Sequence, residues 1–215
     1  MLKASTEYPT AEHFMPEHIS LPALREAAAS CHGCPLWRTG TQTVFGEGPA
    51  KAHLMLVGEQ PGDQEDKTGR PFVGPAGRLL DDILEEVGIP RTDVYVTNVV
   101  KHFKWQPRGN RRIHSKPNAR EMTACKPWLS AELEVVKPQM VVCLGASAAQ
   151  WLLGKEFRVT KQRGKVIKGT PYAPWVMATY HPSAVLRMPD EESRHKARDT
   201  LVADFRIVAH QLDEA

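Results

Sequence analysis

Four short apolar runs constrain the fold of this chain more than any other feature. They span residues 53–57, 94–100, 140–144 and 175–179, and segments with helical patterns separate them. Strands that are apolar along their whole length are typical of a parallel sheet that is covered by helices on both faces. We therefore predict a three-layer α/β/α fold with a central four-stranded parallel sheet, formed by a single domain over residues 21–215.

The segments around these runs carry helix and loop signals. Apolar residues recur with a helical period, and glycine or proline marks several of the ends. The predicted helices span residues 21–30, 75–87, 127–136, 146–153 and 191–212. We expect residues 1–20 to form a loose N-terminal arm, residues 101–117 a basic and aromatic loop, and residues 164–168 a short extra strand.

The composition adds limits on environment and partners. The chain has 215 residues and a formal charge of +3, a mildly basic balance that permits a polyanionic partner without requiring one. No apolar run is long enough to span a bilayer, and the N-terminus lacks the apolar region of a signal peptide. We therefore expect a cytoplasmic protein without membrane contact, in which the four cysteines do not form structural disulfides.

Polar residues follow the ends of the apolar runs. The ends carry Glu59, Asn98, Gly145 and His181. Ligands of parallel sheets bind outside the carboxyl ends of the strands, so an acid, an amide and an imidazole are expected to meet at one site. Each of these residues could instead cap its strand. The glycine-rich stretch 58–77 after the first run could be a phosphate cradle or a surface turn.

The four cysteines suggest a metal centre. Cys31-x2-Cys34 lies near the start of the chain, and Cys125-x17-Cys143 lies further on. Four thiolates suit zinc or an iron–sulfur cluster. The second pair lacks the close spacing of a zinc ribbon. Alternatively, Cys143 is a small buried residue of its strand and only the first pair matters. The spacing alone leaves cluster, zinc and no metal open.

Four ordered motifs resemble one known family. They are Gly58-Glu59-Gln60-Pro61-Gly62, Gly69-Arg70-Pro71-Phe72-Val73-Gly74-Pro75-Ala76-Gly77, Tyr95-Val96-Thr97-Asn98 and His181-Pro182-Ser183. The chain resembles the iron–sulfur uracil-DNA glycosylases of families 4 and 5. The resemblance implies a uracil-DNA glycosylase-like fold and a [4Fe-4S] cluster. The cluster ligands that it implies are Cys31, Cys34, Cys125 and Cys143.

Two departures from family 4 point to one branch of this group. Family 4 enzymes carry alanine at the position of Gln60, and they lack the basic insert Arg108-Gly109-Asn110-Arg111-Arg112-Ile113-His114. Both departures resemble UdgX, the branch that becomes covalently joined to uracil-DNA. That branch typically reads Lys-Arg-Arg-Ile-His, and Asn110 stands here at the position of the lysine.

The resemblance also implies roles in holding the base, which must leave the stack and enter a pocket. Phe72 would stack on the uracil. The Asn98 amide can donate to one base oxygen and accept from the ring N–H, a pairing that cytosine does not offer. His181 would hydrogen-bond the other oxygen as negative charge develops there. Gln60 and Asp63 are expected beside the bound nucleotide.

His114 is the predicted nucleophile of a single-turnover reaction. Its imidazole would attack the cationic sugar carbon in place of water, and Glu59 would orient the ring and take its proton. The expected partner is uracil-containing DNA, preferably single-stranded, bound by a monomer in the bacterial nucleoid. Basic residues suited to the phosphates are Arg108, Arg111, Arg112, Lys116 and Arg187.

Two other functions stay open at this point. The chain could be an ordinary glycosylase of family 4 that turns over, with His114 as one more polar residue facing DNA. It could also be a non-catalytic, metal-containing module that binds nucleic acid without regard to uracil.

Overall fold

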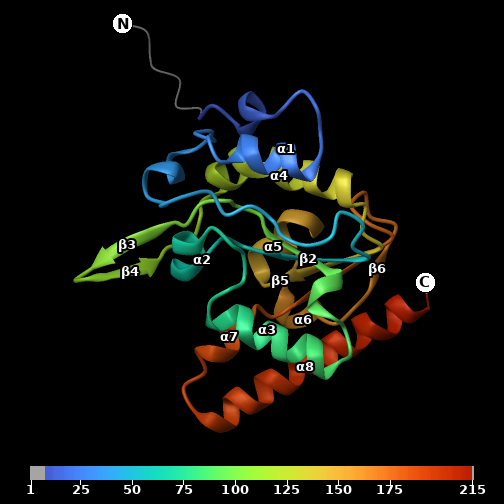
Figure 1. The fold of residues 1–215 in the computed structure, drawn as a ribbon. Helices are drawn as coiled ribbons and strands as arrows, with labels where there is room; N and C mark the ends of the chain where they lie inside the picture. Colours follow the sequence, from blue (N-terminus) through green and yellow to red (C-terminus); the bar gives the residue numbers. More distant parts are fainter. Residues whose placement is uncertain (1–7, 215) are drawn as a thin grey trace, which may run out of the picture.

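A mixed sheet between two helical layers forms the centre of the protein (Figure 1). The computed structural model describes residues 8–214. The sheet strands, in spatial order, are β2 (Val94–Asn98), β1 (Leu54–Gly58), β5 (Met140–Leu144), β7 (Trp175–Thr179) and β6 (Ile167–Lys168). The first four are parallel, and β6 pairs antiparallel with β7. The predicted α/β/α class with four parallel strands is confirmed, and the extra strand joins the sheet at its edge.

Three helices cover each face of the sheet. On one face lie α1 (Leu21–Ala28), α4 (Ala119–Val136) and α5 (Ala146–Leu153). On the other lie α3 (Pro75–Glu86), α7 (Pro182–Leu186) and α8 (Glu191–Asp213). The short elements are α2 (Asp63–Thr68), α6 (Val159–Gln162), η1 (Ala11–Phe14), η2 (Pro35–Arg38) and η3 (Arg91–Asp93). Within residues 8–214, no helix has both the length and the apolar character needed to cross a bilayer.

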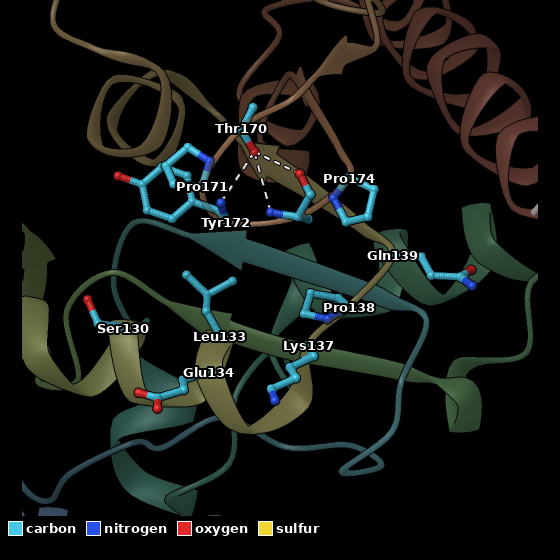
Figure 2. Close-up of a pocket in the computed structure, with 11 residues that line it drawn as sticks. Ser130, Leu133, Glu134, Lys137, Pro138, Gln139, Thr170, Pro171, Tyr172 and Pro174 are labelled. Atoms are coloured by element: carbon cyan, nitrogen blue, oxygen red, sulfur yellow. Dashed lines mark hydrogen bonds between the residues drawn. The ribbon is translucent and has the colours of Figure 1, made fainter.

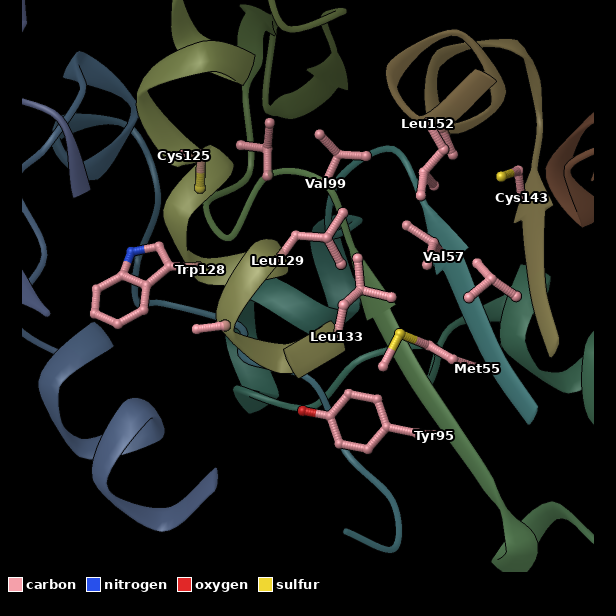
Figure 3. Close-up of a cluster of buried hydrophobic side chains, with 14 of the residues drawn as sticks. Met55, Val57, Tyr95, Val99, Cys125, Trp128, Leu129, Leu133, Cys143 and Leu152 are labelled. Atoms are coloured by element: carbon pink, nitrogen blue, oxygen red, sulfur yellow. The ribbon is translucent and has the colours of Figure 1, made fainter. Parts of the chain in front are cut away.

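Side chains of each strand alternate between two apolar clusters. Met55 and Val57 of β1 face α4, where they join Trp128 and Leu129 in the cluster of Figure 3. Leu56 and its alternate neighbours face the opposite layer with α3 and α8. Because both faces are buried, the strands are apolar without interruption.

The segment predicted as a basic loop contains a β-hairpin. Strands β3 (Trp105–Arg108) and β4 (Arg111–His114) pair antiparallel and project from the body (Figure 1). Gly109 opens the two-residue turn with a φ of 58°, a conformation that glycine adopts without strain. The loop prediction was wrong here because most hairpin side chains are exposed, so no alternation of apolar and polar residues marks the strands.

Helix α4 begins eight residues before the predicted start at Pro127. Asn118 accepts a hydrogen bond from the amide of Glu121, whose carboxylate accepts one from the amide of Asn118. This capping box fixes the true N-terminus, and the proline lies inside the helix. In the segment predicted as a loose arm, residues 1–7 lie outside the described residues, and Ala11 is buried against the core.

A buried ion pair joins the end of β2 to α4. The ammonium of Lys101 binds the carboxylate of Glu132, and both side chains are at most 1% exposed. Lys101 also donates to Thr97 Oγ1 at 2.6 Å and to the carbonyl oxygen of Asn98 at 2.8 Å. Glu132 also accepts from the hydroxyl of Tyr95. These hydrogen bonds satisfy both charges, which burial would otherwise penalise heavily.

Replacing Glu132 by alanine should therefore destabilise the protein strongly. The variant would leave the Lys101 ammonium buried without its counter-charge, a loss of about 3–5 kcal/mol in the free energy of unfolding. Urea unfolding measures it. The matched control is Glu134→Ala, two residues along the same helix, where the side chain is exposed. Equal stabilities for the two variants would contradict the importance of the ion pair.

Candidate active site

A cavity of about 570 Å³ opens at the carboxyl ends of the parallel strands. Its walls come from the segments that follow β1, β2, β5 and β7, as expected for a parallel sheet whose strand order reverses at β1. Eight of the residues singled out in the sequence line it. They are Glu59, Gln60, Phe72, Asn98, His114, Lys116, His181 and Arg187.

Phe72 forms one wall of the cavity. Its backbone has an unfavourable conformation that close packing of the neighbouring segments maintains. Its φ is 55°, in the left-handed region that non-glycine residues rarely adopt. A Cβ on Gly77 would lie 1.8 Å from the carbonyl oxygen of Phe72, and a Cβ on Gly58 would lie 2.9 Å from its ring. Glycine at both positions is thus required to admit this loop, which presents the aromatic ring to the cavity.

Asn98 brings an unused acceptor to the same cavity. The side chain is 3% exposed, and its Oδ1 atom has no hydrogen-bond partner in the described structure. A Cβ on Gly58, its neighbour in register on β1, would lie 2.3 Å from that oxygen. Buried acceptors are nearly always satisfied. The described residues thus supply no donor to Oδ1, and Asn98 lines the cavity.

His181 is held as a neutral donor. The amide of Ser183 donates to Nδ1 at 3.1 Å, and the Ser183 hydroxyl lies 2.8 Å from the same atom. Nδ1 thus accepts, so the proton of the neutral ring is on Nε2. Burial lowers the pKa of His181 to about 4. The ring lies 6.0 Å from that of Phe72, with 27° between their planes.

Glu59 and His114 meet at the mouth of the cavity. Nε2 of His114 lies 3.4 Å from Oε1 of Glu59, and the other carboxylate oxygen accepts from the hydroxyl of Ser147. Burial raises the pKa of Glu59, but hydrogen bonds from His114 and Ser147 outweigh this effect and hold the pKa below its usual value. The arrangement is a carboxylate beside an imidazole that is 54% exposed to solvent, which suits proton transfer or nucleophilic attack.

Gln60 holds the hairpin that carries His114. Its amide accepts from the backbone N–H of Lys104 at 3.0 Å and donates to the carbonyl oxygens of Lys104 and Ser115, at 3.2 and 3.1 Å. Lys104 precedes β3 and Ser115 follows β4, so one side chain closes the base of the hairpin. Gln60 also lines the cavity, so its predicted place beside the nucleotide stays a prediction.

Asp63 does not line the cavity. Its carboxylate accepts from Arg112 Nε at 2.5 Å and from Lys67 at 2.6 Å, and the expected contact of Asp63 with the nucleotide stays a prediction. Arg112 also binds the buried Asp66 at 2.6 Å. Arg112 is therefore an anchor of the hairpin, whereas Arg108 and Arg111 are exposed near its tip.

The sequence analysis missed two positioning residues. The Ser147 hydroxyl donates to Glu59, and Ser147 lies in the first turn of α5, after the end of β5. Glu65 is buried and accepts hydrogen bonds from the amides of Gly62 and Gly74 at 3.1 and 2.7 Å. These bonds tie together two distant points of the glycine-rich stretch 58–77. Glu65 is the third residue of α2, and the signal that could have identified it is an acid three residues after the glycine that precedes the helix.

Three of the four cysteines lie near one another. Burial raises the pKa of the Cys34 thiol to about 11 and that of Cys125 to about 12, and neighbouring cysteines among Cys31, Cys34 and Cys125 add to both shifts. Burial alone raises the pKa of the Cys143 thiol, with no contribution from another cysteine. Figure 3 shows Cys143 across the apolar cluster from Cys125. The predicted four-cysteine set therefore does not assemble, because Cys143 points into the core beneath α5. Among residues 8–214, no group of three or more possible ligands is arranged to hold a metal ion.

A second cavity lies at the opposite end of the sheet (Figure 2). It measures about 800 Å³ and is bounded by the end of α4 and the segment 170–174, next to the amino ends of β5 and β7. None of the predicted site residues lines it. Both the unused acceptor and the paired carboxylate and imidazole belong to the cavity at the carboxyl ends.

The neutral state of His181 predicts how stability depends on pH. The unfolded chain binds a proton at this residue near pH 6.5, whereas the folded protein binds it only near pH 4. Lowering the pH from 7 to 5 should therefore cost about 2 kcal/mol of unfolding free energy through this group. Measured by urea unfolding, the fall in unfolding free energy between pH 7 and pH 5 should be smaller in His181→Asn than in the wild type by that amount. The control His195→Asn, at an exposed histidine of α8, should behave like the wild type. An unchanged loss in His181→Asn would contradict the assignment.

Comparisons with known proteins agree with the geometry. Residues 45–206 match the model of the uracil DNA glycosylase superfamily. A type-4 uracil-DNA glycosylase of Thermotoga maritima is 43% identical over 79% of this chain and 84% of its own length. Those of Sulfurisphaera tokodaii and Archaeoglobus fulgidus are 40% and 39% identical, over 87% and 88% of this chain and 87% and 92% of their own lengths. The chain thus belongs to the uracil-DNA glycosylase superfamily.

Proposed function

We propose that the protein removes uracil from DNA and is then covalently joined, through His114, to the abasic sugar that remains. The unused Oδ1 acceptor of Asn98, buried in the cavity, is the observation that carries the first part. The type-4 relatives support uracil removal. The pairing of His114 with Glu59 supports the second part.

Recognition of the base rests on three side chains. Oδ1 of Asn98 accepts from the N3–H of uracil, and cytosine has no hydrogen at N3 to offer. Phe72 gives an apolar face for the ring. The Nε2–H of His181 donates to a base oxygen. As the bond between base and sugar breaks, its electron pair goes to the base, and this donor stabilises the resulting anion.

His114 then takes the place of water. One imidazole nitrogen gives its electron pair to the cationic C1′ atom of the sugar, which forms a carbon–nitrogen bond. The proton on the other nitrogen passes to the Glu59 carboxylate, which the Ser147 hydroxyl keeps in position. The ring ends uncharged and bonded to the sugar. This bond is stable, so each protein molecule reacts once.

The clamp formed by Gln60 supports this mechanism. A nucleophile must be held close to the carbon that it attacks. Gln60 fixes both ends of the hairpin, and Arg112 anchors its middle through Asp63 and Asp66. Exposed Arg108 and Arg111 near the tip, with Lys116 and Arg187 at the cavity, are suited to DNA phosphates. A preference for single strands follows, because the base is then already unpaired.

An iron–sulfur cluster is proposed for the group formed by Cys31, Cys34 and Cys125. Their thiols are buried and adjacent, which suits such a centre, although Cys143 does not complete the set. A bound cluster would join the N-terminal segment to α4. No step of the base removal described above depends on it.

The covalent product can be tested on a denaturing gel. Wild-type protein incubated with uracil-containing single-stranded DNA should give a protein–DNA band that survives heat and detergent. His114→Ala should give no such band, because the attacking nitrogen is gone, while uracil should still be released with water in its place. The control His195→Ala should form the band normally. Free abasic DNA without a band from the wild type would instead support a glycosylase that turns over.

The cysteine assignment predicts different results for two serine variants. Cys125→Ser should lose iron and visible absorption, whereas Cys143→Ser should retain both. Iron content and absorption spectra of anaerobically purified protein measure this. Equal loss of iron in both variants would return Cys143 to the ligand set.

A further inference from the structure

One exposed aromatic side chain lies outside the cavity. Five large apolar side chains are exposed among residues 8–214: Ile19, Trp37, Ile113, Leu186 and Ile207. Trp37, in η2, is the aromatic member and is 38% exposed. Exposed tryptophan leaves a large apolar surface in water, a common feature of binding surfaces.

The ring of Trp37 is held in a fixed orientation. The imidazole of His32 lies 4.2 Å from it between ring centroids, and the guanidinium of Arg38 lies 5.5 Å from its centre. Contacts of this kind restrict the side chain, so that a further ring can stack on it at a low cost in conformational entropy.

The segment that carries Trp37 is joined to the hairpin of His114. The indole N–H of Trp105 donates to the carbonyl oxygen of Thr39 at 2.7 Å. Trp105 is the cross-strand partner of His114. Trp37 precedes Thr39 by two residues, so this contact brings the segment of Trp37 to the base of the hairpin.

Basic side chains lie on both segments. The acids Asp63 and Asp66 are both bound to Arg112 of the hairpin. The guanidinium of Arg112 also lies 5.5 Å from the ring of Trp105. Exposed Arg38 and the exposed arginines of the hairpin remain to meet an anion. Aromatic rings beside arginines are typical of surfaces that bind single-stranded nucleic acid.

We propose that Trp37 is a stacking subsite for a base of the same DNA strand, outside the uracil cavity. The strand would run from the cavity past Trp105 to Trp37, where an unpaired base stacks on the exposed part of the indole and Arg38, beside the ring, meets the backbone. The proposal rests on the proposed action on uracil-containing DNA, and it adds a place where a second base of the strand is held.

The test measures binding of a fluorescent, uracil-free single strand to the full-length protein by anisotropy. Trp37→Ala should weaken binding about five- to one-hundred-fold, the effect of losing one stacked base. Trp37→Phe should restore most of the affinity. The slope of affinity against salt should not change, because no charge is removed. Binding to a duplex, whose bases are already stacked, should be unaffected.

Ile207→Ala is the matched control, since Ile207 is 40% exposed on α8. It should bind the single strand like the wild type. Wild-type affinity in Trp37→Ala, or equal weakening in Trp37→Ala and Trp37→Phe, would overturn the proposal. The strand contains no uracil, so the result is independent of base removal. Failure of the wild type to release uracil from a uracil-containing strand would count against the proposed function instead.

Discussion

The buried pair of Lys101 and Glu132 holds the functional end of the sheet to the helix that covers it. The lysine ammonium contacts the carbonyl oxygen of Asn98, and the lysine amide donates to the sulfur of Cys125 at 3.3 Å. One residue therefore touches both the strand end that faces the cavity and the helix that carries a cysteine. A buried charge that loses its partner is costly. The ion pair therefore holds the end of β2, helix α4 and Cys125 in fixed positions relative to one another.

The pairing of Glu59 with His114 depends on a second set of contacts, between the loop of residues 58–77 and the hairpin. Glu59 and Gln60 are adjacent in sequence but act in different directions. Glu59 faces the imidazole of His114, while Gln60 binds the main chain at both ends of the hairpin. The residue that pairs with His114 and the residue that positions its hairpin are thus on one loop, which Glu65 ties together through Gly62 and Gly74.

The sheet and most of the cavity could be predicted from the sequence because apolar runs and strand-end residues obey local rules. Asn98 and His181 came to one cavity since parallel strands end at the same edge. The hairpin was missed because its strands lack an alternation of apolar and polar residues. Side chains from other segments, such as Gln60, hold it in place instead. The partners of Asp63 and the isolation of Cys143 depend on distances across the fold, which no spacing along the chain encodes.

The hydrogen bonds of Gln60 reach only backbone atoms of Lys104 and Ser115. Hydrogen bonds to backbone atoms do not depend on which side chains Lys104 and Ser115 carry. The exposed tip of the hairpin makes neither these contacts nor those of Arg112, so it is free to vary in sequence while the base stays in register with the cavity. Side chains at this tip, such as those of Arg108 and Arg111, can therefore be exchanged without moving His114.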